Sequence, residues 1–333
     1  MKSRNLTIGI TNISEIPGKY LFNRIKDLGL NVVDLTKNDK LEINDELQVI
    51  YCFPSYSKFM NQYLKLYKNL NWVQCSFAGV DQFVQHKDIF KEKQIQFTNM
   101  KGVFSPSLGE FTMAAILYWE KRMDLFSKSK LEKSFEKFPV NMLNEHTIGI
   151  VGYGNIGVEV AKRAKLGFGM NVIGLKTNLE NIEGKEYCDK IVDNSKIEYL
   201  LNNSDYVVNI LPKTKLTDDY FDDNKFKMMK KDSIFINIWR GSSVNEDDLI
   251  KHLKIKTNLK AATLDVTKIE PLPKESELWN LDNCFISNHS ADKLNDNMDN
   301  EKLSIDFFIK ILNDEYLKNG IVKTNLVDLY KEY

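Results

Sequence analysis

The sequence has 333 residues, of which 43% are hydrophobic and 28% charged, and this length and composition predict a globular protein of two domains. Its 46 basic residues balance its 46 acidic ones, so we expect no basic surface for nucleic acid or anionic lipid. No apolar run approaches the ~20 residues of a membrane helix, and the start of the chain has no long apolar stretch, so we expect neither a signal peptide nor a membrane partner. The four cysteines lie far apart, so we expect no disulfide framework, no metal site and a cytoplasmic location.

Short β-rich runs alternate with helical patterns along almost the whole chain, which predicts an α/β protein with parallel sheets. The runs form two series and therefore indicate two sheets. The first series lies at 6–11, 31–35, 48–53, 72–77 and 96–100, and the second at 147–152, 171–176, 206–211, 233–238, 261–266 and 284–288. Between them, residues 107–123 are apolar at helical spacing and are long enough for a helix that bridges two domains.

A glycine-rich turn follows the first strand of the second series. Gly152, Gly154 and Gly157 form a G-x-G-x-x-G motif, with Asn155 and Ile156 inside it, between an apolar strand and a helical pattern. In this setting the glycines allow a tight turn, the approach of a pyrophosphate, and close packing of helix on strand, while the helix N-terminus attracts phosphate. The alternative is a turn without a ligand, which the flanking strand and helix disfavour. We therefore expect a dinucleotide cofactor, NAD or NADP.

Lys176 ends the second strand of this nucleotide fold, where a site for NAD usually has an acid that binds the ribose hydroxyls. An acid would also repel the 2′-phosphate of NADP, whereas an ammonium attracts it. Residues 174–178 contain no Asp or Glu, so we expect NADP in preference to NAD. The alternative is a solvated lysine at the strand end of an enzyme that uses NAD.

Arg240, Glu270 and His289 follow successive later strands, and ligands of open α/β sheets lie beyond the carboxyl ends of the strands. Reducing a 2-keto acid requires a proton donor and an anchor for the carboxylate. Histidine can protonate the forming alkoxide, a carboxylate can orient the imidazole, and arginine binds a carboxylate through paired N–H groups. Each residue alone has an ordinary structural explanation, but their shared position favours catalysis.

The chain resembles the D-isomer-specific 2-hydroxyacid dehydrogenase family over nearly its whole length, in segments at 76–83, 100–111, 149–164, 211–217, 237–253, 264–273, 278–291 and 325–328. This resemblance implies that Arg240 binds substrate, that Glu270 pairs with the acid/base, and that His289 is the acid/base. It also implies that backbone N–H groups at Ala78 and Gly79 bind the substrate carboxylate. By the same resemblance, the cofactor site includes Leu211, Pro212, Thr217, Ile238, Trp239, Asp265 and His289 as well as the glycine turn and Lys176.

The resemblance implies two Rossmann- or flavodoxin-like domains with parallel sheets, in which a cofactor domain (105–293) is inserted into a substrate domain (1–104 and 294–333). It also implies a homodimer. Three residues depart from the family pattern: Asn288 stands where Pro commonly precedes the catalytic His, Lys176 replaces the acid, and Trp239 replaces a small residue and is expected to narrow the pocket. The segments at 72–83 and 149–157 are most similar to the glyoxylate and hydroxypyruvate reductases of the family.

We therefore expect an NAD(P)-dependent D-2-hydroxyacid dehydrogenase, or 2-keto acid reductase. One alternative is a relative that acts on 3-phosphoglycerate, phosphite or formate. An alternative from another class is a dinucleotide-sensing binding protein of the corepressor type. Because the chain retains Arg240, Glu270 and His289, the enzyme is favoured.

Overall fold

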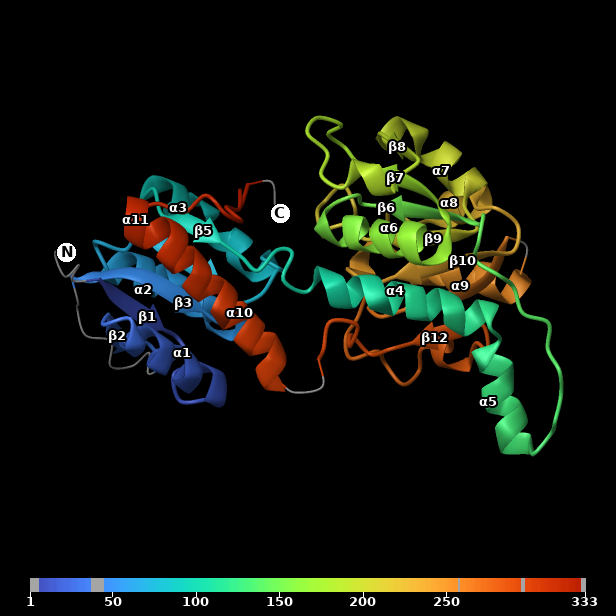
Figure 1. The fold of residues 1–333 in the computed structure, drawn as a ribbon, viewed down its shortest axis with the longest axis horizontal. Coiled ribbons are helices and arrows are strands. Elements are labelled where there is room, and N and C mark those ends of the chain that lie inside the picture. The colour runs from blue at the N-terminus through green and yellow to red at the C-terminus, as the bar shows by residue number, and fades with distance from the viewer. Residues whose placement is uncertain (1–5, 37–44, 257, 295–296, 331–333) are drawn as a thin grey trace. The chain divides into compact units, whose positions relative to one another are not determined.

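The computed structural model describes residues 6–36, 45–256, 258–294 and 297–330. Within these ranges the chain forms two compact units (Figure 1). The first unit combines the chain up to Phe104 with the chain from Lys293 onward, and the second unit is Ser105–Asp292. The second unit is therefore inserted into the first, and it ends one residue before the expected boundary.

The first unit has a five-stranded parallel sheet in the order β2-β1-β3-β4-β5. Its strands are β1 (Thr7–Ile10), β2 (Asn31–Asp34), β3 (Leu47–Cys52), β4 (Trp72–Cys75) and β5 (Gln96–Thr98). Its helices are α1 (Ile16–Asp27), α2 (Met60–Leu66), α3 (Lys87–Glu92), α10 (Asn297–Ile311) and α11 (Leu317–Asn319). Phe308 of α10 packs against Tyr51 and Trp72 of the sheet, with ring centroids 5.0 and 5.2 Å apart, so the late helix completes the core of this unit.

The second unit has a seven-stranded parallel sheet in the order β12-β11-β10-β9-β6-β7-β8. Its strands are β6 (Thr147–Val151), β7 (Asn171–Leu175), β8 (Lys190–Val192), β9 (Tyr206–Asn209), β10 (Ser233–Asn237), β11 (Leu259–Leu264) and β12 (Cys284–Ile286). Its helices are α4 (Ser105–Glu120), α5 (Met123–Glu132), α6 (Asn155–Phe168), α7 (Ile197–Asn203), α8 (Asp223–Met228) and α9 (Glu246–Ile255). The strand order reverses between β6 and β9, which is the position where doubly wound sheets bind ligands. The predicted fold class is confirmed.

Helix α4 differs from the helix expected to bridge two domains. It begins at Ser105, the first residue of the second unit, and it packs along α6 (Figure 1). Its buried residues Leu108, Ile116 and Trp119 belong to a hydrophobic cluster of that unit. The helix therefore lies within the second unit, because its apolar side completes the core there.

No helix in the described ranges combines the length and the apolar character that crossing a membrane requires. Over the same ranges, no group of three or more His, Cys, Asp and Glu residues is arranged to hold a metal ion. All four cysteines are free thiols, and burial raises the pKa of Cys75, on β4, to about 12. These thiols are therefore protonated at neutral pH.

Candidate active site

The predicted site residues of the second unit follow its strands at one edge of the sheet. Because every pair of neighbouring strands is parallel, the carboxyl ends of the strands meet at that edge. The residues that follow them are Gly152 after β6, Lys176 after β7, Leu211 after β9, Trp239 and Arg240 after β10, Asp265 after β11, and His289 after β12.

The glycine turn is tight at two positions and open at the third. Gly152 has φ 109°, and a Cβ atom there would lie 2.7 Å from the Ile210 carbonyl oxygen. A Cβ atom on Gly157 would lie 2.7 Å from the Gly152 carbonyl oxygen, whereas a Cβ atom on Gly154 would meet no atom within 4 Å. Helix α6 starts directly after Gly154, so its first N–H groups, from Asn155 onward, can bind an anion beside that open space. The turn fits the pyrophosphate of a dinucleotide.

At the end of β7, Lys176 is half-buried, and its backbone N–H donates to the Val192 carbonyl oxygen over 2.9 Å. Asp193 follows the neighbouring strand β8. Hydrogen bonds from the hydroxyl and backbone N–H of Ser195, 2.6 and 2.8 Å long, lower the pKa of Asp193. This carboxylate therefore caps its own turn, and the Thr177 hydroxyl next to Lys176 in sequence accepts from Asn194 Nδ2 over 3.3 Å.

The loop after β9 is closed by Thr217. Its hydroxyl donates to the Pro212 carbonyl oxygen over 2.5 Å and accepts from the Thr214 N–H over 2.9 Å. The Leu211 N–H donates to the Asn209 side-chain oxygen over 3.2 Å. These bonds fix the loop that was predicted to contact the cofactor.

Trp239 supports the guanidinium of Arg240. The Arg240 Cζ atom lies 4.5 Å from the centroid of the Trp239 ring, and Arg240 Nη1 donates to the Trp239 carbonyl oxygen over 2.8 Å. A cation above an indole ring is attracted by its negative face. The bulk of Trp239, expected to narrow a pocket, thus lies beneath the arginine, while the preceding Ile238 is buried in the core.

The loops after β10 and β11 touch at Gly241. A Cβ atom on Gly241 would lie 2.0 Å from the carbonyl carbon and oxygen of Thr267. The Thr267 N–H in turn donates to Glu270 Oε1 over 3.1 Å. Only glycine allows this approach, which brings the turn that carries Arg240 against the loop that carries Glu270.

His289 and Glu270 form a direct pair. His289 Nδ1 lies 2.7 Å from Glu270 Oε2, and the two side chains are 50% and 38% exposed. Because Glu270 occupies Nδ1, Nε2 is the ring nitrogen left to face another molecule. The structure therefore brings together two of the three residues predicted to act in catalysis.

Asp265 organises the loop that carries His289. Its carboxylate is buried, and Oδ1 accepts hydrogen bonds from the Ser287 hydroxyl and from the N–H groups of Ser290 and Ala291, over 2.7, 2.8 and 3.0 Å. Its carbonyl oxygen accepts from the His289 N–H over 2.6 Å. The role predicted for Asp265, cofactor binding, stays a prediction, but its carboxylate also holds the histidine loop.

The backbone before and at the histidine is left-handed, with φ 55° at Asn288 and φ 53° at His289. Proline is restricted to φ near −65°, so it cannot adopt the conformation of Asn288. The backbone before His289 is therefore one that a proline at position 288 could not adopt.

In the first unit, Ala78 and Gly79 lie in the loop after β4 and are partly exposed. Asn99 Nδ2 donates to the Ala78 carbonyl oxygen over 2.7 Å, and Cys75 Sγ lies 3.9 Å from the Gly79 carbonyl oxygen. The loop is thus held by its carbonyl groups. Its predicted role, binding the substrate through N–H groups, stays a prediction.

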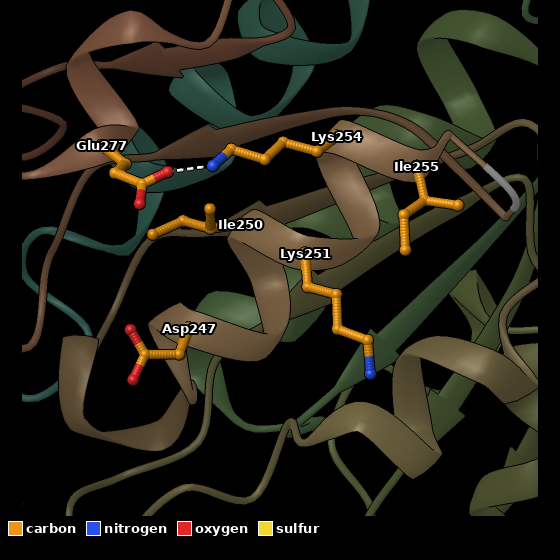
Figure 2. A pocket seen from close by; sticks show the side chains of 6 residues that line it. All are labelled: Asp247, Ile250, Lys251, Lys254, Ile255 and Glu277. Carbon is orange, nitrogen blue, oxygen red and sulfur yellow. Dashed lines mark hydrogen bonds and ion pairs between the residues drawn. The ribbon is translucent and has the colours of Figure 1, made fainter.

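A separate pocket of about 380 Å³ lies against helix α9 (Figure 2). It is lined by Asp247, Ile250, Lys251, Lys254, Ile255 and Glu277. Lys254 pairs with Glu277, and Lys251 pairs with Asp223 over 2.9 Å. The lining has equal numbers of acids and bases and includes none of the predicted site residues, so we assign it no role in the reaction.

Three buried residues near Arg240 were missed in the sequence: Asn209, Asn237 and Ser243. The two asparagines are the last residues of the apolar strands β9 and β10. A polar residue at the carboxyl end of an apolar strand is the signal that could have identified them.

Comparisons with known proteins show which family the chain is similar to. A family model described as D-isomer specific 2-hydroxyacid dehydrogenase, NAD binding domain, matches residues 113–291. A hydroxypyruvate reductase of Thermotoga maritima is 29% identical over 275 residues, covering 81% of this chain and 86% of that protein. A glyoxylate/hydroxypyruvate reductase B of an Enterobacter species is 36% identical over 181 residues, covering 53% of each chain. A D-isomer specific 2-hydroxyacid dehydrogenase of Xanthobacter autotrophicus, solved with NADPH and MES, superposes with TM-score 0.82 at 22% identity, covering 99% of this chain and 100% of that one.

Proposed function

The chain belongs to the D-isomer specific 2-hydroxyacid dehydrogenase family, and on that basis we propose that it reduces a small 2-keto acid of the glyoxylate and hydroxypyruvate type with NADPH. It is an NAD(P)-dependent oxidoreductase that transfers a hydride between the cofactor and a 2-keto or 2-hydroxy acid. The observation that carries the proposal is the 2.7 Å contact between His289 Nδ1 and Glu270 Oε2 at the carboxyl edge of the sheet.

The roles follow from the chemistry of each group. When bound, the nicotinamide supplies the hydride. Arg240 binds the substrate carboxylate through paired N–H groups, and His289 donates a proton from Nε2 to the carbonyl oxygen as it becomes an alkoxide. Glu270 fixes the ring through Nδ1 and stabilises the imidazolium. For Ala78 and Gly79, the proposed role is hydrogen bonding from the backbone N–H groups to a substrate carboxylate.

The proposed acid is tested by His289→Ala. We expect the rate of keto acid reduction to fall by about 10²- to 10⁴-fold, which is the usual contribution of a general acid, while NADPH still binds. Glu270→Gln retains the size of the side chain but loses its charge, so we expect a smaller loss. Near-normal turnover by His289→Ala would remove this residue from the mechanism.

The substrate class is tested by following cofactor oxidation at 340 nm with a panel of 2-keto acids, including glyoxylate, hydroxypyruvate and pyruvate. We expect the highest kcat/KM with glyoxylate or hydroxypyruvate. Binding of NADPH without turnover of any acid would instead favour a dinucleotide sensor. Activity only in the reverse direction with 3-phosphoglycerate, phosphite or formate would favour another branch of the family.

The proposed preference for NADPH rests on the half-buried Lys176 after β7. Its contribution is a point charge and should weaken as salt increases. We expect Lys176→Asp to raise KM for NADPH and to lower KM for NADH, because the new carboxylate can accept bonds from the ribose hydroxyls. A wild-type enzyme that prefers NADH, with NADPH kinetics unaffected by the substitution, would contradict the proposal.

We further propose that the protein is a cytoplasmic homodimer, joined through an arm formed by residues 123–142, which carries exposed apolar side chains among charged ones. The arm comprises α5 and the segment that follows it, and it extends from the rest of the second unit (Figure 1). Within the arm, Phe135 is 98% exposed, Leu131 84% and Met142 73%. Apolar side chains that are this exposed favour contact with a second copy of the same surface.

Light scattering after size exclusion tests the dimer. The double variant Leu131→Ser and Phe135→Ser should be monomeric, whereas Ile16→Ser, a change at a residue 67% exposed in the first unit, should leave the dimer intact. A wild-type monomer would contradict the proposal, as would a double variant that remains dimeric.

A further inference from the structure

A buried hydrogen-bond network lies beneath the turn that carries Arg240. Its members are Asn209 at the end of β9, Asn237 at the end of β10, and Ser243 in the short turn after Arg240. All three side chains are inaccessible to solvent. Polar groups buried to this extent are costly unless they are satisfied, so their partners indicate what the network holds in place.

Asn209 connects two loops of the proposed site. Its Nδ2 donates to Asn237 Oδ1 over 3.1 Å and to Ser243 Oγ over 2.6 Å, and its Oδ1 accepts from the Leu211 N–H over 3.2 Å. One side chain thus links the loop after β9, which is expected to contact the cofactor, to the residues around Arg240.

Asn237 and Ser243 converge on the Arg240 carbonyl oxygen. Asn237 Nδ2 donates to it over 3.0 Å and Ser243 Oγ donates over 2.6 Å. With its carbonyl held from below and its guanidinium above the Trp239 ring, Arg240 is fixed at both its backbone and its side chain. Such fixation reduces the conformational freedom that the arginine would lose when it binds a carboxylate.

We propose that Asn209, Asn237 and Ser243 are positioning residues that hold Arg240 in register for the substrate carboxylate. This inference rests on the proposed role of Arg240. All three act through the Arg240 backbone and not by contact with the reacting atoms. Loss of Asn237 or Ser243 should therefore weaken productive substrate binding and leave cofactor affinity largely unchanged, whereas loss of Asn209 also releases the Leu211 N–H in the loop expected to contact the cofactor.

The test removes one hydroxyl. We expect Ser243→Ala to raise KM for glyoxylate about 5- to 10-fold at saturating NADPH, the effect of one hydrogen bond, and to change kcat and the Kd for NADPH less than about 2-fold. Ser204→Ala is the matched control, because its hydroxyl is equally buried but donates to the Leu200 carbonyl oxygen of α7, and Ser204 precedes β9 whereas Asn209 ends it. The control should retain the wild-type KM. Asn237→Ala, which removes the second donor, should raise KM in the same way as Ser243→Ala.

A double-mutant cycle with Arg240→Lys separates the inference from its premise. If Ser243 acts through Arg240, then Ser243→Ala should change KM less than about 2-fold in the Arg240→Lys background. If Arg240→Lys raises KM but Ser243→Ala has no effect, or has the same effect in both backgrounds, the positioning role is wrong and the role of Arg240 stands. If Arg240→Lys leaves KM unchanged, the proposed role of Arg240 is wrong, and the positioning role with it.

Discussion

Asn288 directly precedes His289, the proposed acid, and its backbone conformation supports a prediction. With φ 55° it adopts a left-handed conformation that asparagine and glycine tolerate and proline cannot reach. We expect Asn288→Gly to retain most of the activity. Asn288→Pro should lose most of it, because the proline must move His289 away from Glu270. Steady-state kinetics and thermal melts of both variants test this. A fully active Asn288→Pro enzyme would mean that the left-handed backbone is not required.

The contact between the Trp239 ring and the Arg240 guanidinium leads to a second prediction at the scale of single residues. Its ring lies 4.5 Å below the Arg240 Cζ atom, and an interaction of this type contributes about 0.5–2 kcal/mol. Trp239→Leu should therefore raise KM for glyoxylate about 2- to 30-fold, and Trp239→Phe, which retains an aromatic face, should raise it less.

Measuring a larger keto acid in the same variants distinguishes the two possible roles of Trp239. If the ring mainly narrows the pocket, Trp239→Leu will improve turnover of the larger acid and leave KM for glyoxylate unchanged. That result would contradict support of Arg240 by the ring.

At the scale of elements, the turn between β6 and α6 contains two glycines, one of which should be required for stability and the other for cofactor binding. A Cβ atom on Gly157 would lie 2.7 Å from a backbone oxygen, so Gly157→Ala should destabilise the protein by about 1–3 kcal/mol. The space beside Gly154 is open, so Gly154→Ala should fold normally but bind NADPH more weakly, because the methyl group would stand where the pyrophosphate approaches. Melting curves and fluorescence titration with NADPH measure both effects. Gly154→Ala with wild-type affinity would show that the phosphates lie elsewhere.

Most strands were predictable from the sequence because each is a short apolar run ended by polar or glycine residues. Strand β8 was missed because Lys190–Val192 contains only two apolar residues and pairs on one side only, at the sheet edge. Helix α4 begins two residues before the apolar stretch at 107–123 and ends three residues before that stretch does.

The candidate site was predictable in part. The positions of Arg240, Glu270 and His289 after strands could be identified, because parallel strands end at one edge. The hydrogen-bond network around Arg240 could not be predicted, because Asn209 and Ser243 are far apart in the sequence and are brought together only by the order of the strands in the sheet. The left-handed backbone at Asn288 could not be predicted from the sequence either, since asparagine can adopt φ of either sign.

At the scale of the whole molecule, each unit contains its own hydrophobic clusters. Two clusters lie entirely within the second unit, and two others are formed by residues of the first. The second unit is continuous in sequence and holds the complete seven-stranded sheet, whereas the first is assembled from both parts of the chain. The second unit is therefore the one that we expect to fold when it is produced alone.

We expect residues 105–292, produced alone, to fold cooperatively and to bind NADPH, because this stretch contains the glycine turn and its entire sheet. A ligand at about 100 times its Kd stabilises the folded state by about 2.7 kcal/mol, so NADPH should raise the Tm of the fragment by roughly 5–10 °C. The same fragment carrying Gly154→Ala should show a much smaller rise. The fragment should not reduce keto acids, because it lacks the loop at Ala78 and Gly79 that is proposed to bind the substrate carboxylate. A soluble fragment whose Tm does not respond to NADPH would show that cofactor binding needs the first unit, which the separate cores do not predict.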